Sequence, residues 1–139
     1  MSTAFVVDAS MACAWVLPGQ ASAEADALLE LIEAGASPIV PSFWFLEVAN
    51  GLLTAERRGL ITADERKLAL ERLCALAFTV DEDDARNALG RTSALAVQYG
   101  LSVYDAACLE LALRRKLPLG TRDRALRNVV ERGGVPLFD

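Results

Sequence analysis

Four acidic side chains, Asp8, Glu47, Asp105 and Asp123, stand where carboxylates could gather around a metal ion. Asp8 and Asp123 each follow a short apolar run typical of a buried strand, and Asp105 opens an expected helix. Glu47 lies inside a helix that is otherwise mostly apolar. Four carboxylates held close together would repel one another unless they were protonated or bound a cation. Oxygen ligands without histidine or cysteine favour Mg²⁺ or Mn²⁺ over zinc.

Each acid also has a purely structural explanation. Asp8 and Asp123 are favoured residues for the N-cap of a following helix. Asp105 lies three residues after Ser102, which fits a capping box. Glu47 could face solvent or pair with an arginine. Capping or pairing accounts for any one of these acids, but it accounts less well for four acids at strand ends and on an apolar helix.

Other residue types that could do chemistry are missing or unsuitable. The sequence contains no histidine, which excludes the Ser-His-Asp triad, the Cys-His pair and the commonest general base. The three cysteines, Cys13, Cys74 and Cys108, form no CxxC motif and are expected to be reduced and buried. An enzyme with this sequence must therefore use carboxylates, a metal ion or rarer groups.

Charge is distributed unevenly along the chain. The net charge of the 139 residues is −5, which argues against a protein that coats nucleic acid. Residues 1–100 carry 7 basic and 14 acidic side chains, a net charge of −7. Residues 101–139 carry 7 basic and 5 acidic side chains, a net charge of +2. The C-terminal part can therefore form a local basic surface.

Expected strands and helices alternate along the chain. We predict strands at 4–7, 38–41, 78–80, 117–121 and 135–138, and helices at about 10–17, 22–34, 42–58, 62–75, 81–99, 102–116 and 123–132. This alternation predicts an α/β fold with a mostly parallel central sheet covered on both faces, formed by one domain of residues 1–139. Ligands of such sheets bind beyond the carboxyl ends of the strands.

The segment after Ser42 combines aromatic residues with an acid. Ser42 is expected to cap a helix that is apolar on nearly every side and therefore largely buried. A carboxylate such as Glu47 is unfavourable there unless it is paired or coordinates a metal. Large apolar side chains either pack in the core or line a groove for a partner helix. They are Trp15, Phe43, Trp44 and Phe45.

Four segments together resemble the sequence pattern of PIN domains. They are Val-Val-Asp-Ala-Ser at 6–10, Phe-Leu-Glu-Val-Ala-Asn at 45–50, Leu-Ser-Val-Tyr-Asp-Ala-Ala at 101–107 and Gly-Thr-Arg-Asp-Arg-Ala-Leu at 120–126. Each segment alone is a weak signal, whereas all four in order, spread over the whole chain, are specific. The short length and the form of these segments look most like VapC, the toxin of VapBC toxin–antitoxin pairs.

The resemblance implies a three-layer α/β/α PIN-like domain and an endoribonuclease that needs Mg²⁺ or Mn²⁺. It also implies an antitoxin protein that binds and inhibits the chain, and a homodimer. The catalytic quartet that it implies is Asp8, Glu47, Asp105 and Asp123. The metal ligands within this quartet would be Asp8, Asp105 and Asp123. The polar supports of the quartet would be Ser10, Asn50 and Thr121.

This resemblance implies that an activated water hydrolyses an RNA phosphodiester and leaves 5′-phosphate and 3′-hydroxyl ends. The basic residues best placed to bind RNA phosphates are Arg122, Arg124 and Arg127, although they could instead form the solvated face of a short helix. No apolar run approaches the roughly 20 residues of a membrane span. The first residues lack the basic segment of a signal peptide, so we expect a cytoplasmic protein without a membrane partner.

Two other functions fit part of the pattern. A phosphohydrolase could form an aspartyl-phosphate on Asp8, but haloacid-dehalogenase-like enzymes carry a second acid where this chain has Ser10. Such enzymes also use a lysine near the phosphate, and this chain has only Lys67 and Lys116. A PIN-like module that only binds or dimerises would be catalytically silent, although all four acids are present. The sequence favours the nuclease and leaves its RNA substrate open.

Overall fold

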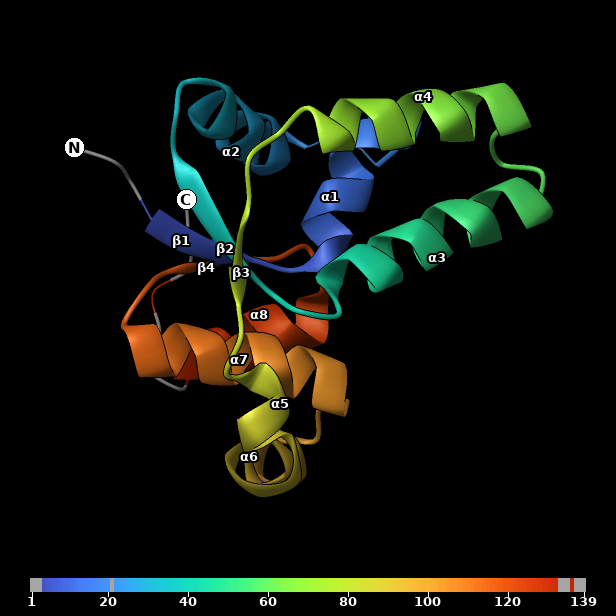
Figure 1. Cartoon of the computed structure of the whole chain (residues 1–139). Coiled ribbons are helices and arrows are strands. Elements are labelled where there is room, and N and C mark those ends of the chain that lie inside the picture. Colours follow the sequence, from blue (N-terminus) through green and yellow to red (C-terminus); the bar gives the residue numbers. More distant parts are fainter. Residues whose placement is uncertain (1–3, 21, 133–135, 137–139) are drawn as a thin grey trace.

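The computed structural model describes residues 4–20, 22–132 and 136, and its centre is a parallel β-sheet (Figure 1). The strands are β1 (Ala4–Val7), β2 (Ser37–Pro41), β3 (Thr79–Asp81) and β4 (Leu119–Gly120). They lie in the order β3-β2-β1-β4, and every neighbouring pair is parallel. The predicted parallel sheet is thereby confirmed. The predicted strand at 135–138 lies outside the described residues except for Pro136, whose carbonyl oxygen accepts a hydrogen bond from the Leu119 amide.

Helices connect the strands and cover both faces of the sheet. They are α1 (Ala9–Val16), α2 (Ala23–Glu33), α3 (Trp44–Arg57), α4 (Ala63–Cys74), α5 (Asp84–Asn87), the π-helical η1 (Ala88–Thr92), α6 (Ser93–Tyr99), α7 (Val103–Arg115) and α8 (Arg124–Arg132). Figure 1 shows α1, α2 and α4 on one side of the sheet and α7 and α8 on the other. This is the three-layer α/β/α fold that the sequence resemblance implied. None of the helices in the described part is long and apolar enough to cross a bilayer.

The alternation of side chains along β1 explains the two helical layers. Phe5 and Val7 pack into one cluster with residues of α1, α2, α3 and α4. Val6 packs into a second cluster with residues of α7 and α8. All three side chains are fully buried. Because successive side chains of a strand point to opposite faces, a strand covered on both faces needs an unbroken apolar run.

The helix that carries Glu47 differs from the prediction at its start and in its burial. Ser42 does not cap α3, because its amide and hydroxyl both donate to the Asp84 carboxylate, at 3.2 and 2.6 Å. The helix begins at Trp44 without a side-chain cap. Trp44 is buried in the core, but Leu46 is 76% exposed. The expectation of a helix buried on nearly every side was therefore wrong.

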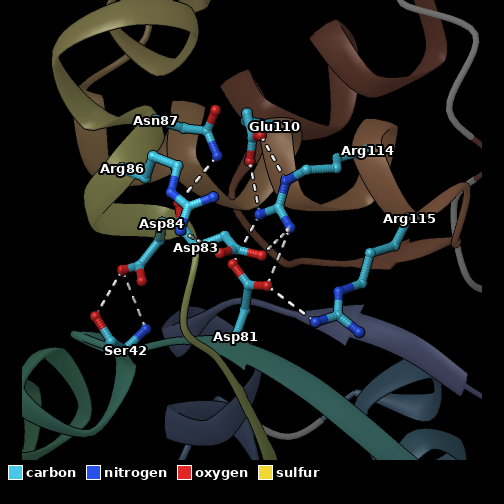
Figure 2. Close-up of polar contacts among 9 residues, drawn as sticks. All are labelled: Ser42, Asp81, Asp83, Asp84, Arg86, Asn87, Glu110, Arg114 and Arg115. Atoms are coloured by element: carbon cyan, nitrogen blue, oxygen red, sulfur yellow. Dashed lines mark hydrogen bonds and ion pairs between the residues drawn. The ribbon is translucent and has the colours of Figure 1, made fainter.

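The segment predicted as one helix from 81 to 99 consists of a strand end and three helical pieces. Asp81 is the last residue of β3, and only Asp84 begins a helix. The chain then passes through α5, η1 and α6, which ends at Gly100 in the left-handed conformation with φ 65°. Acidic residues favour the first turn of a helix, which is why a helix was predicted to start at Asp81. Asp81 is instead buried and accepts hydrogen bonds from Arg114 and Arg115 of α7, as Figure 2 shows.

The three cysteines are free thiols, as predicted, but they are not all buried. Cys108 is buried in α7, and Cys13 is half-buried in α1. Cys74, the last residue of α4, is exposed. The expectation of three buried thiols was therefore wrong for Cys74, because an apolar neighbourhood in the sequence does not fix which side of a helix faces the core.

Candidate functional site

Asp8 lies at the carboxyl end of β1, the strand that pairs with both β2 and β4. Its amide donates to the Gly120 carbonyl oxygen at 3.1 Å, so the ends of β1 and β4 lie side by side. Its carboxylate accepts hydrogen bonds from Ser10 Oγ at 2.6 Å, from the Met11 amide at 3.2 Å and from the Thr121 hydroxyl. Asp8 therefore caps α1, as predicted, and also joins two distant parts of the chain.

Ser10 and Thr121 link Asp8 to the segment that carries Asp123. The hydroxyl oxygens of Ser10 and Thr121 lie 3.4 Å apart. Ser10 Oγ accepts from the Arg122 amide at 3.0 Å, and Thr121 Oγ1 accepts from the Asp123 amide at 3.0 Å. Asp123 also accepts a hydrogen bond from the first turn of α8, so its predicted capping role is confirmed. These two hydroxyls hold the loops of Asp8 and Asp123 next to each other.

Gly120 has a role in this arrangement that sequence analysis missed. A Cβ atom on Gly120 would lie 2.7 Å from Leu28 Cδ1 of α2, so a side chain there would require Leu28 to shift. The absence of a side chain lets the end of β4 lie close to α2, next to the residue that hydrogen-bonds to Asp8. A glycine inside a strand often marks such a close approach, and this signal could have identified the position.

Asp105 and Glu47 come from two helices that begin close to each other. The Ser102 hydroxyl accepts a hydrogen bond from the Asp105 amide at 3.1 Å, which confirms the predicted cap of α7. Phe43, just before α3, meets Tyr104 of α7 edge-on, with ring centroids 5.3 Å apart. This aromatic contact joins the helix start that carries Glu47 to the helix start that carries Asp105.

Burial and mutual repulsion raise the pKa values of three of the four acids. Burial raises the pKa of Asp8 to about 6, although its hydrogen bonds act in the opposite direction. Burial raises the pKa of Glu47 to about 7, and the charges of Asp105 and Asp8 contribute to the same shift. Burial raises the pKa of Asp105, and the charge of Asp123 adds to it. The four acids therefore interact electrostatically although they come from distant segments.

The thiol of Cys108 lies near the same acids. Burial raises its pKa well above the ordinary value, and the charges of Asp8, Glu47 and Asp105 raise it further. The same three carboxylates therefore act on one buried atom of α7. Because the thiol stays protonated in this setting, Cys108 has the character of a packing residue and not of a thiolate ligand.

The four acids do not form a tight ligand shell as they are placed. Within the described part of the chain, no three acidic or cysteine side chains stand close enough together to hold a metal ion. Asn50, the third predicted support, is exposed, and its side chain forms no hydrogen bond to another described residue. The network of contacts therefore includes Ser10 and Thr121 but not Asn50.

The three predicted RNA-binding arginines differ in their surroundings. Arg122 donates from its guanidinium to the Gln20 carbonyl oxygen. Arg127 forms an ion pair with Glu24 of α2, at 2.8 Å. Arg124 is exposed at the start of α8. Two of the three arginines thus connect the segment after β4 to the α1–α2 region, and Arg124 is left facing solvent.

Replacing Glu47 with glutamine is expected to stabilise the metal-free protein at alkaline pH. An acid whose pKa rises on folding destabilises the folded protein once the pH exceeds its pKa in the unfolded chain. For Glu47 this destabilisation is complete above its folded pKa of about 7. After discounting for partial exposure, we expect a gain of roughly 1 kcal/mol at pH 8, or about 3 °C in melting temperature. Thermal unfolding in chelator measures this gain, which should shrink at pH 5.

The matched control for this variant is Glu30→Gln. Glu30 is exposed on α2, and its replacement removes the same charge from the chain. We expect the melting temperature to change by less than about 1 °C. If both variants gained equally, net charge and not the acid group around Glu47 would be the cause.

Comparisons with known proteins place this chain in a family. The family model described as PIN domain matches residues 5–131. Ribonuclease VapC3 from Pyrobaculum aerophilum is 33% identical over 121 residues, which are 87% of this chain and 90% of the relative. Protein PAE2754 from the same organism has a solved structure that aligns with a TM-score of 0.69 and 25% identity, covering 91% of this chain and 84% of that one.

A more distant structure has the same fold. VapBC2 from Rickettsia felis, solved bound to a DNA fragment from its promoter, aligns with a TM-score of 0.64 and 12% identity. The alignment covers 96% of this chain and 94% of that one. The family model covers nearly the whole chain, and the identity to a VapC protein extends over most of both sequences. The chain therefore belongs to the PIN domain family and is of the VapC type.

Proposed function

We propose that this chain is a magnesium-dependent endoribonuclease that acts as the toxin of a type II toxin–antitoxin pair. The observation that carries the proposal is the electrostatic coupling of Asp8, Glu47, Asp105 and Asp123 in a chain related to a ribonuclease VapC. Acids with raised pKa values and a shared location are typical of a functional site. Capping alone explains Asp8, Asp105 and Asp123 but not their interaction with Glu47.

The residues present suit a hard divalent cation. All four donors are carboxylates, which Mg²⁺ and Mn²⁺ prefer, and their mutual repulsion is relieved when a cation binds. We propose that Asp8, Asp105 and Asp123 hold the cation, with Glu47 beside them. When bound, such a cation offsets the charge of the phosphate and makes a water molecule a stronger nucleophile.

Side chains of this chain would orient the Asp8 carboxylate and accept a proton during the reaction. Ser10 and Thr121 donate to both oxygens of Asp8 and fix the orientation of its carboxylate. Glu47 is a carboxylate beside the proposed cation, and we propose that it accepts the proton of the attacking water. The RNA phosphorus would then lose its bond to the 3′ oxygen, leaving a 3′-hydroxyl and a 5′-phosphate.

Basic residues near the acids would hold the RNA backbone. Arg122 and Arg124 are exposed on the segment that follows Thr121, and Arg127 lies one turn further on. Phosphate contacts supply most of the affinity of such complexes. Because Arg127 is paired with Glu24 and Arg122 donates to the Gln20 carbonyl oxygen, we expect Arg124 to contribute most.

This chain has a groove beside α1 that is suitable for binding a segment of an antitoxin. A cavity of about 660 Å³ opens between α1, α2 and α4, and apolar side chains line much of it. They include Trp15, Leu29, Ile32, Leu73 and Leu76. We propose that an amphipathic helix of the antitoxin binds there. Among the similar structures, one is a toxin–antitoxin complex from Klebsiella pneumoniae.

A second copy of the chain would cover another apolar surface. Leu89 of η1 is 98% exposed and Val97 of α6 is 83% exposed, and Val103 and Tyr104 of α7 are about half exposed. Leu89, Val103 and Tyr104 line one hollow, and exposed apolar side chains grouped in this way mark interaction surfaces in soluble proteins. We propose that this face forms the homodimer.

Incubation of the purified protein with total RNA tests the nuclease proposal. We expect discrete fragments with Mg²⁺ or Mn²⁺ and none with chelator, and each fragment should carry a 5′-phosphate and a 3′-hydroxyl. Ligation of adapters that require each kind of end identifies the ends. Products with a 2′,3′-cyclic phosphate would contradict the mechanism, because that group requires attack by the RNA's own 2′-hydroxyl. Absence of both cleavage and metal binding would leave a silent binding module.

A further inference from the structure

A groove of about 280 Å³ lies between α1 and α3 and opens beside Asp8. We call it the α1–α3 groove. Its lining begins at Ser10, whose hydroxyl donates to Asp8, and includes Cys13 of the same helix. Gln20, Thr54 and Arg58 supply its polar side chains away from the acids. The groove therefore shares Ser10 with the candidate site and extends away from the acids.

Helical spacing explains why this groove runs outward from the acids. On α3, Glu47, Gly51 and Thr54 follow one another at intervals of four and three residues, and Arg58 comes four residues later. Such residues lie on one side of a helix. A Cβ on Gly51 would lie 3.2 Å from Cys13 Sγ, so the missing side chain keeps this wall close to α1.

Three polar side chains of the groove, those away from the acids, have no partners in the described part of the chain. The side chains of Gln20, Thr54 and Arg58 form no hydrogen bond or ion pair there, although the Gln20 carbonyl oxygen accepts from Arg122. Unpaired donors and acceptors grouped around one hollow are available to a ligand. Because Arg122 is itself a proposed RNA contact, the groove adjoins the expected RNA path.

Charge selects the kind of group that fits. The inner end of the groove begins at Ser10, whose hydroxyl donates to Asp8, and at Gly51, which follows Glu47 by four residues on α3. A neutral base needs no counterion at this end, whereas the cleaved phosphate is proposed to lie at the cation held by the acids. Arg58 at the outer end is the groove's one charged residue among those described. Arg58 lies eleven positions after Glu47, a rise of about 16 Å along the helix axis, so it would contact a different part of the RNA from the cleaved phosphate.

We propose that the α1–α3 groove binds one unpaired base of a single-stranded RNA, next to the phosphate that is cleaved. Gln20 and Thr54 contact the edge of the base, and the Arg58 guanidinium stacks on it or binds the adjoining phosphate. The volume is below the roughly 300–1,000 Å³ of pockets for drug-sized ligands, which suits a single base. The proposal rests on the proposed nuclease function and names the form of its substrate.

Binding of a short RNA tests the groove separately from catalysis. The probe is a fluorescent, mixed-sequence single strand of ten nucleotides, and the protein carries Asp8→Asn to prevent cleavage. Adding Arg58→Ala should weaken binding about tenfold, as the loss of one stacked base does. Adding Thr54→Tyr, which fills the groove, should weaken binding by a similar factor. Anisotropy measures both, and melting temperatures confirm that each variant is folded.

Arg57→Ala is the matched control. Arg57 is the neighbouring residue of Arg58, is equally exposed and unpaired among the described residues, and does not line the groove. We expect its affinity to stay within about twofold of the parent. Equal losses for Arg57→Ala and Arg58→Ala, or no loss for Thr54→Tyr, would overturn the proposal. Equal affinity for a fully paired duplex would also overturn it, because a paired base cannot enter the groove.

Sequencing of cleavage products provides the second measurement. With catalytically active protein, Gln20→Ala should change the base preference at one position beside the cut and leave the metal requirement intact. An unchanged preference would remove Gln20 from base contact. If the unmodified chain cut no RNA, the nuclease proposal would fail, and the binding comparison would still decide whether the groove holds a base.

Discussion

The Asp8→Asn variant should cleave RNA about a thousandfold more slowly than the unmodified chain, or slower still, while keeping its fold. Asparagine has the same shape as aspartate, and its side-chain oxygen can accept the hydrogen bonds from Ser10 and Met11. It lacks the charge with which Asp8 and Asp105 would share a cation. Initial rates on a labelled RNA measure the loss, and calorimetric titration with Mn²⁺ measures the expected loss of metal affinity.

A change of charge elsewhere should not reproduce this result. Asp26 is exposed in the first turn of α2, so Asp26→Asn removes the same charge without touching the acid group. We expect it to cleave at the rate of the unmodified chain. A folded Asp8→Asn protein that kept more than about a tenth of the rate would remove Asp8 from the proposed catalytic group.

The largest loss of stability should follow from Arg114→Met. The Arg114 guanidinium donates to both carboxylate oxygens of Asp81, at 3.1 and 2.7 Å, and to both of Glu110, at 2.8 and 3.1 Å. Figure 2 shows it between these two acids, which are 0% and 1% exposed. Removing one partner of a buried ion pair costs about 3–5 kcal/mol, because the other charge stays buried. Urea unfolding at neutral pH measures the difference.

Acid should reduce this difference. Hydrogen bonds from Arg114, and further from Arg115, hold the pKa of Asp81 below its ordinary value. An acid with a lowered folded pKa adds stability above its unfolded pKa, and that contribution is lost as the pH falls through the folded value. The gap between Arg114→Met and the unmodified chain should therefore narrow below about pH 4. A gap that was constant down to pH 3 would exclude the Asp81 pair as its source.

The control for this variant lies in the same cluster. Arg86 is 84% exposed and lies 3.9 Å from Asp83 (Figure 2). Arg86→Met should change the free energy of unfolding by less than about 0.5 kcal/mol, because exposed pairs contribute little. Comparable losses from the two variants would show that burial of Asp81 and Glu110 does not determine the effect.

Local patterns in the sequence predicted the parts of the structure that depend on local physics. An apolar run followed by an acid predicted β1 and the cap of α1, and the structure has both at Asp8. Ser102 and Thr62 cap the helices expected to follow them. These contacts join residues two to four positions apart, so the chain carries their signal in adjacent letters.

Contacts between distant segments were not predictable in the same way. The acids at 81–84 favoured a helix start, but Asp81 pairs with Arg114, 33 residues further on. Ser42 suited a cap, but its partner is Asp84, 42 residues away. Nothing in the neighbouring residues specifies such partners. The exposure of Leu46 was not predictable for a similar reason. The apolar composition of a helix does not indicate whether the rest of the chain or another molecule covers its apolar side chains.

The hydrogen bond between Thr121 and Asp8 spans 113 residues, and this separation has a consequence for synthesis on the ribosome. At about 5–20 residues per second, roughly 6–23 s pass between the addition of Asp8 and that of Thr121. During that interval a nascent chain contains β1 but not β4, so the hydrogen bond from Thr121 that orients the Asp8 carboxylate cannot form. Translation must therefore pass residue 123 before the candidate site can assemble.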